Sequence, residues 1–281
     1  VSLSANWMWP CNNEGEDARL YEAVEAVSDF AIALGINIPT GKDSLSMKQR
    51  YPDGDVVAPG TVIISAAGHC NQIKQVVEPV LEKEEGDIYY INFSQDSYQL
   101  GGSSFAQTLN KIGAVAPDIK DPIFVKNAFN ALQEMISKDQ IAAGHDIGSG
   151  GLITTLLEMC FADLNLGASI DLSALGESDT IKLLFAENAG VVFQLKAKAS
   201  TAILDAAAIS YHKIGKVTNT PTLEIKNDRV AIGLPVASLR DTWMSTSALL
   251  DEKQTANGRG LARFENYKHQ ALDYSFPNNF T

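Results

Sequence analysis

Stretches typical of strands and of helices alternate along the whole of this 281-residue chain. Residues 1–10, 61–68 and 87–93 are apolar stretches that favour strands, and residues 222–226 and 229–233 flank a turn at Asn227-Asp228. The first helix has apolar residues at three- or four-residue spacing, followed by Gly35 as its stop. These positions are Leu20, Val24, Val27, Ala31 and Leu34. The alternation predicts an α/β or α+β fold in which helices pack on sheets.

The charge of the chain is strongly acidic. Asp plus Glu number 34 and Lys plus Arg number 22, which gives a formal charge of −12. An acidic excess argues against a nucleic-acid partner, because phosphate backbones attract clustered cations. An anionic small molecule can still be held by a few cations, by backbone amides or through a bound metal.

The three cysteines lie far apart and have neither disulfide-framework nor zinc-ligand spacing. They are Cys11, Cys70 and Cys160. We therefore expect reduced thiols and a cytoplasmic protein. No apolar run approaches the ~18–20 residues that span a bilayer, so we expect no membrane partner.

The sequence divides into three stretches, residues 1–74, 75–238 and 239–281. The first is small for an independent core. It also opens at Val1 within a strand-like pattern, so we interpret the chain as a fragment whose exposed strands could pair with a second copy as a homodimer. The last stretch is polar and weakly periodic, and we expect a linker there.

The first candidate site is Gly41-Lys42-Asp43-Ser44, which we expect to form a polar loop after a short strand at residues 36–39. A lysine can neutralise phosphate, an aspartate can bind Mg²⁺ or orient the lysine, and a serine can bond phosphate oxygens. The spacing is not that of a P-loop. A solvated turn is an equally good interpretation of the bare string.

The second candidate site is the turn at residues 145–151, with sequence HDIGSGG. Asp146 precedes a glycine-rich turn into a helix, an arrangement that can offer amides, a helix dipole and a metal ligand to a nucleotide. The structural alternative is that the glycines only permit a tight turn and that Asp146 caps the helix. Further along, Glu187-Asn188 interrupts an apolar segment.

Five collinear strings closely resemble the long form of the phosphoribosylformylglycinamidine synthase family. They are LSANWM at 3–8, GEDARLYEAV at 15–24, PTGKDSLSM at 39–47, HDIGSGGL at 145–152 and LFAEN at 184–188. The resemblance implies a truncated N-terminal synthetase-type domain at 1–74, which in the family forms a barrel with its counterpart. It further implies a complete C-terminal α/β domain of the aminoimidazole ribonucleotide synthetase type at 75–238, and a linker toward a glutaminase domain at 239–281.

The resemblance implies a ligase that converts formylglycinamide ribonucleotide to its amidine with ATP and glutamine-derived ammonia. The catalytic histidine would lie in the first synthetase half and the nucleophilic cysteine in the glutaminase domain, both outside this chain, so the chain alone is expected to be inactive. A non-catalytic Mg-nucleotide-binding module is the alternative from another class. Another ATP-dependent enzyme of the same superfamily, such as selenophosphate synthetase, would lack the first and third strings.

The resemblance also implies roles for the site residues. Gly41 and Ser44 would face the active site, and Lys42 stands where shorter relatives carry asparagine. Asp146 matches a ligand of the Mg²⁺ that holds a second, non-reacting ATP or ADP. The family has a serine two residues later, where this chain has Gly148 followed by Ser149.

Overall fold

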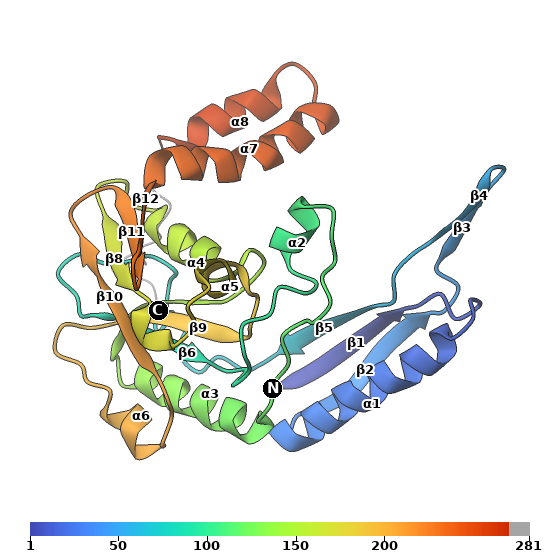
Figure 1. Cartoon of the computed structure of the whole chain (residues 1–281), viewed down its shortest axis with the longest axis horizontal. Coiled ribbons are helices and arrows are strands. Elements are labelled where there is room, and N and C mark those ends of the chain that lie inside the picture. Colours follow the sequence, from blue (N-terminus) through green and yellow to red (C-terminus); the bar gives the residue numbers. More distant parts are fainter. Residues whose placement is uncertain (270–281) are drawn as a thin grey trace. The chain divides into compact units, whose positions relative to one another are not determined.

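The computed structural model describes residues 1–269, which form two compact units that divide between Ile73 and Lys74 (Figure 1). Both units combine sheets with helices, so the predicted α/β class is confirmed. No helix within residues 1–269 has the length and apolar character needed to cross a membrane.

Unit 1 (Val1–Ile73) is built on a three-stranded sheet. β1 (Ser2–Met8) is the central strand, parallel to β2 (Asn37–Ser44) and antiparallel to β5 (Thr61–Ala67). A parallel pair needs a crossover connection, and the long helix α1 provides it. The hairpin of β3 (Lys48–Tyr51) and β4 (Gly54–Val57) forms a separate two-stranded sheet.

Helix α1 (Glu16–Leu34) begins and ends as its sequence predicts. Two acidic residues lie in the first turn, and Gly35 ends the helix with a φ of 76°. The predicted core position Ala31 is buried, but Val24 is 42% exposed. A long helix on a three-stranded sheet buries only a narrow stripe, so several large apolar side chains of unit 1 stay exposed. These include Tyr21 and Ile32 of α1 and Ile63 and Ile64 of β5.

Unit 2, from Lys74 onward, is built on a seven-stranded sheet of order β12-β11-β8-β10-β6-β9-β7. All neighbouring pairs are antiparallel except β11 and β8. The strands are β6 (Ile88–Asn92), β7 (Ile141–Asp146), β8 (Gly167–Asp171), β9 (Gly190–Leu195), β10 (His212–Thr218), β11 (Thr222–Asn227) and β12 (Val230–Pro235). The predicted hairpin is present as β11 and β12, with Asp228 in the left-handed region of the turn.

Helices cover both faces of this sheet (Figure 1). The helices are α2 (Ser104–Thr108), α3 (Pro122–Ser137), α4 (Gly151–Cys160), the short 3₁₀ helix η1 (Ser173–Leu175), α5 (Thr180–Phe185) and α6 (Ala202–Ala206). One core cluster joins α4 and α5 to the sheet, and a second joins α3 and α6 to it. Successive strand residues alternate between the clusters, since Val192 belongs to the first and Phe193 to the second.

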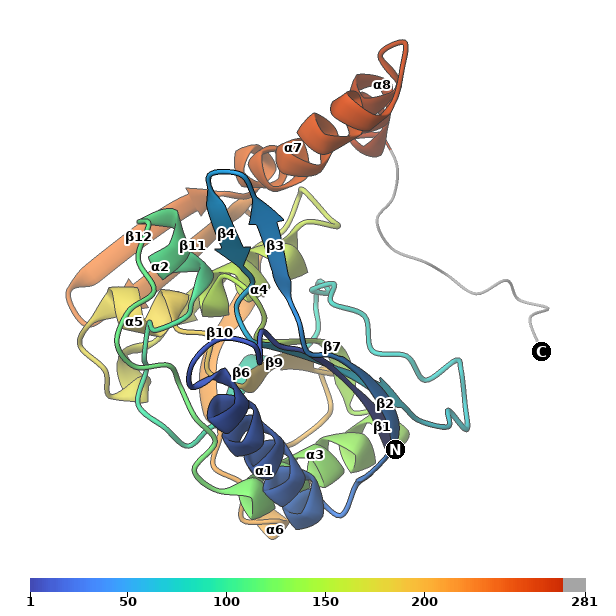
Figure 2. The ribbon, with the colours of Figure 1, turned by 90° about the vertical axis from the view of Figure 1, so that its right-hand side faces the viewer.

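Two helices follow the sheet where the sequence indicated a linker: α7 (Val236–Gln254) and α8 (Arg259–Tyr267), which lie side by side (Figures 1 and 2). The first turns of α7 belong to unit 2, because Val236 is fully buried and Arg240 is 5% exposed. Helix α7 was not predicted, because most of its side chains face solvent and its apolar periodicity is therefore weak. The connection toward a further domain stays a prediction, and residues 270–281 of that stretch lie outside the described residues.

Candidate functional site

The first candidate segment, Gly41 to Ser44, lies within strand β2, so the prediction of a loop is wrong. These residues pair in parallel register with residues 5–8 of β1. Their turn-type composition is outweighed by the ladder hydrogen bonds that β1 provides. Gly41 is required by the close approach of the strands, because a Cβ there would lie 2.1 Å from the carbonyl oxygen of Ala5.

The strand geometry separates the charged residues of this segment. Side chains alternate along a strand, so Lys42 and Ser44 share one face and Asp43 projects from the other. The Lys42 ammonium donates to the Ser44 hydroxyl at 2.9 Å. Lys42 and Asp43 are both exposed and Ser44 is half-buried. The face that carries Lys42 and Ser44 therefore presents a cation and a hydroxyl, a combination suited to phosphate oxygens, without a neighbouring carboxylate from Asp43.

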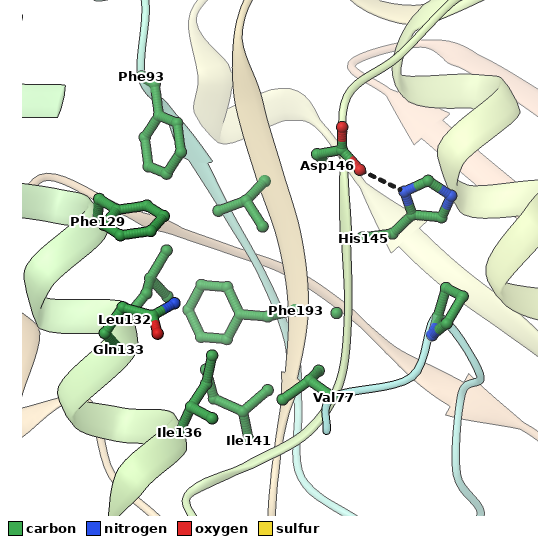
Figure 3. A pocket seen from close by; sticks show the side chains of 13 residues that line it. Val77, Phe93, Phe129, Leu132, Gln133, Ile136, Ile141, His145, Asp146 and Phe193 are labelled. Carbon is green, nitrogen blue, oxygen red and sulfur yellow. Dashed lines mark hydrogen bonds and ion pairs between the residues drawn. The ribbon is translucent and has the colours of Figure 1, made fainter. Parts of the chain in front are cut away.

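The second candidate segment begins at the end of β7, where the side chain of Asp146 is 86% exposed (Figure 3). Its Oδ1 lies 3.2 Å from Nδ1 of His145, and its backbone carbonyl accepts a hydrogen bond from Thr155 Oγ1 at 3.1 Å. Within residues 1–269, Oδ2 forms no hydrogen bond and is free to bind a cation. No group of three or more His, Cys, Asp or Glu residues in that range is arranged to hold a metal ion.

The glycines that follow Asp146 have different roles. Gly150 and Gly151 have φ angles of 91° and 74°, and a Cβ on Gly151 would lie 2.7 Å from the carbonyl oxygen of Leu184. The turn requires both glycines, and the packing of α4 against the C-terminal end of α5 requires Gly151. Gly148 has no atom within 4 Å of the position a Cβ would take. Gly148 and Ser149 are exposed beside Asp146.

A glutamate occupies the N-terminus of α4, where the sequence suggested an anion-binding site. Glu187 Oε1 accepts hydrogen bonds from the amides of Gly150 at 2.8 Å and Ser104 at 2.7 Å. Ser104 is the first residue of α2, so one carboxylate joins the starts of two helices. Glu187 was noted in the sequence as an interruption of an apolar segment and as part of the string LFAEN at 184–188, and neither signal indicated its hydrogen-bond partners.

The neighbouring Asn188 is 1% exposed and ties the same segment to the loop after β6. Its Nδ2 donates to Ser94 Oγ at 2.9 Å and to the carbonyl oxygen of Ser97 at 3.2 Å. Together, Glu187 and Asn188 hold the loops that precede α2 and α4 at the same edge of unit 2.

Asp146 also lies at the border of an apolar pocket of about 410 Å³ between α3 and the strands β7 and β9 (Figure 3). Phe93, Phe129 and Phe193 contribute aromatic rings and Asp146 contributes a polar group, whereas the His145 ring points to Glu158 on α4. Aromatic walls with a few polar groups at one side are typical of small-molecule sites. Lys42 and Ser44 belong to unit 1, and Asp146, Gly148 and Ser149 belong to unit 2.

Two family models match the chain. Residues 1–69 match the FGAR-AT PurM_N-like domain, and residues 94–227 match the C-terminal domain of AIR synthase related proteins. The probable phosphoribosylformylglycinamidine synthase, chloroplastic/mitochondrial, of Arabidopsis thaliana is 38% identical over 261 residues. That alignment covers 90% of this chain and 18% of the relative, so the chain spans less than a fifth of the relative's length.

Solved structures of PurL from Thermotoga maritima share the fold. PurL complexed with FGAR aligns with a TM-score of 0.61 and 16% identity, over 85% of this chain and 39% of PurL. PurL complexed with ATP aligns with a TM-score of 0.57 and 14% identity, over 85% of this chain and 37% of PurL. At these identities the alignments establish the fold, which is the predicted AIR-synthase-type α/β fold, and the family assignment comes from the sequence comparisons.

Proposed function

The chain belongs to the phosphoribosylformylglycinamidine synthase family, and on that premise we propose that it serves a carbon–nitrogen ligase of de novo purine biosynthesis. In the proposed reaction, ATP phosphorylates the amide oxygen of formylglycinamide ribonucleotide, and ammonia from glutamine then displaces phosphate to give the amidine. The observation that carries the proposal is the 38% identity over 261 residues. The activity is assigned to a longer protein, because the chain spans 18% of that relative.

Unit 1 is proposed to contribute the face of β2 that carries Lys42 and Ser44. An ammonium can neutralise charge on phosphoryl oxygens, and the hydroxyl 2.9 Å away can donate to the same oxygens. Gly41 allows β2 to lie close to β1 at this point, because a Cβ there would clash with the carbonyl oxygen of Ala5. Asp43 projects from the opposite face and is proposed to act outside this phosphate contact.

Unit 2 is proposed to hold a Mg²⁺-bound ATP or ADP that does not react. Asp146 would donate one carboxylate oxygen, and the exposed Gly148 and Ser149 would contact the nucleotide. The exposed carboxylate with a free Oδ2 fits such a role, because Mg²⁺ binds through one or two carboxylates plus phosphate oxygens. The bound cation would neutralise phosphate charge in an acidic protein. Its remaining ligands would come from the nucleotide, from water and from residues beyond those described.

The proposed partners are a first synthetase half and a glutaminase domain. Exposed apolar side chains of unit 1, among them Ile32 at 72% and Ile63 at 50%, support the burial of this unit against another domain. Pairing of two copies of the chain is the alternative. Neither nucleic acid nor membrane is a proposed partner, and the cytoplasm is the proposed location, supported by three cysteines that form no disulfide.

Amidine formation with formylglycinamide ribonucleotide, ATP and glutamine, measured on the longer protein, tests the proposed reaction. Replacing Lys42 by Met is expected to lower kcat/KM by about 100-fold, the effect of losing one charge-stabilising contact. Lys198→Met removes an exposed lysine of unit 2 and serves as the matched control, with activity unchanged. The 281-residue chain alone, given ammonium and ATP, is expected not to turn over. Robust turnover by the chain alone would contradict the division of labour proposed here.

A non-catalytic nucleotide-binding role for unit 2 is tested separately by calorimetry with Mg-ADP on the longer protein. Asp146→Ala is expected to weaken Mg-ADP binding at least tenfold. An unchanged affinity would mean that Asp146 is not a ligand of the metal ion. It would not contradict the proposed amidine-forming reaction.

A further inference from the structure

His145 lies between two carboxylates in the described structure. Its Nδ1 is 3.2 Å from Asp146 Oδ1, and its Nε2 is 3.1 Å from Glu158 Oε2 (Figure 3 draws the first contact). The side chains of His145 and Glu158 are each only 24% exposed, whereas that of Asp146 is 86% exposed. Each ring nitrogen of His145 therefore faces a carboxylate oxygen, and the less exposed of the two carboxylates lies on α4.

Glu158 is in turn held by α7. Its second oxygen, Oε1, accepts a hydrogen bond from the indole nitrogen of Trp243 at 2.9 Å. The Trp243 ring also packs edge-on against Phe161, with centroids 6.1 Å apart. One turn earlier on α7, Arg240 donates to the carbonyl oxygen of Phe161 at 3.1 Å. Helix α7 is thus bound to the C-terminal end of α4 by both side chains.

From these contacts we propose that His145, Glu158 and Trp243 are positioning residues that orient Asp146, and that the docking of α7 sets their position. The inference rests on the role of Asp146 as a metal ligand proposed above. Carboxylates and histidines that surround a metal are held by outer hydrogen bonds, whose loss costs 10–100-fold in metal affinity. Here Oδ1 of Asp146 faces His145, which leaves Oδ2 as the oxygen for the cation.

The same contacts link Asp146 to the segment that follows the sheet. Because α7 begins at Val236, directly after β12, its docking depends on the sheet, and its far end continues toward α8. A partner that moves α7 would break the Trp243 contact, free the Glu158 carboxylate and release His145. The metal ligand at the end of β7 would then lose its fixed orientation, and the backbone next to Asp146 would open more readily.

The first test measures Mn²⁺ affinity by electron paramagnetic resonance on the longer protein, in the presence of ADP. Trp243→Phe removes the indole donor but keeps an aromatic ring against Phe161, and it is expected to weaken Mn²⁺ binding about tenfold. His145→Asn is expected to have a similar effect. Leu249→Ala alters a 65% exposed side chain on the same helix and should leave the affinity unchanged.

The second test needs no metal. Amide hydrogen exchange of Ile147, whose N–H donates to the carbonyl oxygen of Gly190 at 2.9 Å, reports on the backbone next to Asp146. Trp243→Phe is expected to speed this exchange about tenfold, while the exchange of the fully buried Ile88 in the interior strand β6 stays unchanged. If exchange at Ile147 stays unchanged, the proposed coupling is wrong.

Asp146→Asn separates the two proposals. If it weakens Mn²⁺ binding but Trp243→Phe and His145→Asn do not, the positioning role is overturned and the metal role stands. If Asp146→Asn has no effect on Mn²⁺, the metal role fails, and the exchange at Ile147 alone decides whether α7 orders the end of β7.

Discussion

Glu187 accepts a hydrogen bond from the amide of Gly150 at 2.8 Å, so an internal carboxylate occupies the N-terminus of α4. The same oxygen accepts a hydrogen bond from the amide of Ser104, at the start of α2. A nucleotide at the turn 146–149 therefore does not have the Gly150 amide at its disposal. Its contacts must come from Asp146, from Gly148 and Ser149, and from a bound cation.

Replacing Glu187 by Ala is expected to lower the free energy of unfolding by about 2–6 kcal/mol, because two partly buried amides lose their acceptor at roughly 1–3 kcal/mol each. Glu187→Gln keeps an oxygen at the same position and is expected to cost under about 1 kcal/mol, the part that depends on charge at a helix N-terminus. Urea unfolding of both variants measures the difference. Equal losses in the two variants would mean that charge, and not the acceptor, holds the helices together.

Substitutions at two glycines of the same turn are expected to destabilise the protein to very different extents. Gly148→Ser places its side chain in open space, so stability should change by less than about 0.5 kcal/mol. Gly151→Ala places a Cβ 2.7 Å from a carbonyl oxygen at a φ of 74°, and should cost at least about 2 kcal/mol. Thermal unfolding compares them directly. A stable Gly151→Ala protein would show that the turn can shift to accept a side chain.

The sequence predicted the local elements well where one pattern dominated. The strand at residues 61–68 and the stop of α1 at Gly35 were both found from apolar spacing and glycine chemistry. The segment from Gly41 to Ser44 was misread as a loop, because its residues favour turns locally and only the ladder with β1 extends the strand. Helix α7 was missed for the converse reason, since few of its side chains are buried and apolar periodicity is weak.

At the candidate site, contacts between residues far apart in the chain could not be predicted from local patterns either. Asp146 stood out because a carboxylate before a glycine-rich turn is a recognisable local pattern. Glu158 and Trp243 have no such local signal, and they are 85 residues apart in the chain. Their contact exists because α7, which follows the last strand of the sheet along the chain, packs against the end of α4. A pattern of apolar spacing specifies which face of a helix is buried, but not which polar groups meet across it.

Asp171, at the end of β8, is expected to make stability depend on acid pH. Hydrogen bonds from the Ser173 hydroxyl and amide, and then from Lys226, lower the pKa of Asp171 to about 2. Because the pKa is lower in the folded state, the stabilisation is complete above the unfolded value of about 3.9 and is lost as the pH falls toward 2.

The variant Asp171→Asn should therefore be less stable than the parent at pH 7, and the difference should vanish near pH 2. The side chain is 52% exposed, so solvent screening keeps the loss at pH 7 below about 1 kcal/mol. Lys226→Met should keep most of the pH dependence, since the Ser173 bonds have the larger effect. Urea unfolding at pH 7, 4 and 2.5 measures both variants, and a gap for Asp171→Asn that is constant with pH would contradict the assignment.

Cys160 is expected to report on the opening of unit 2. It is 2% exposed in the core beneath α4, and burial raises the pKa of its thiol to about 12. The thiolate is the reactive form, so iodoacetamide at pH 8 should label the exposed Cys70 rapidly and Cys160 only when the core opens.

Leu156→Ala empties a fully buried position of the same core and should cost at least about 2 kcal/mol. A loss of stability of this size corresponds to roughly thirtyfold faster labelling of Cys160, and mass spectrometry measures the labelling rate. Leu249→Ala, on the exposed side of α7, should leave the rate unchanged. Labelling of Cys160 as fast as Cys70 in the parent chain would contradict a closed core around α4.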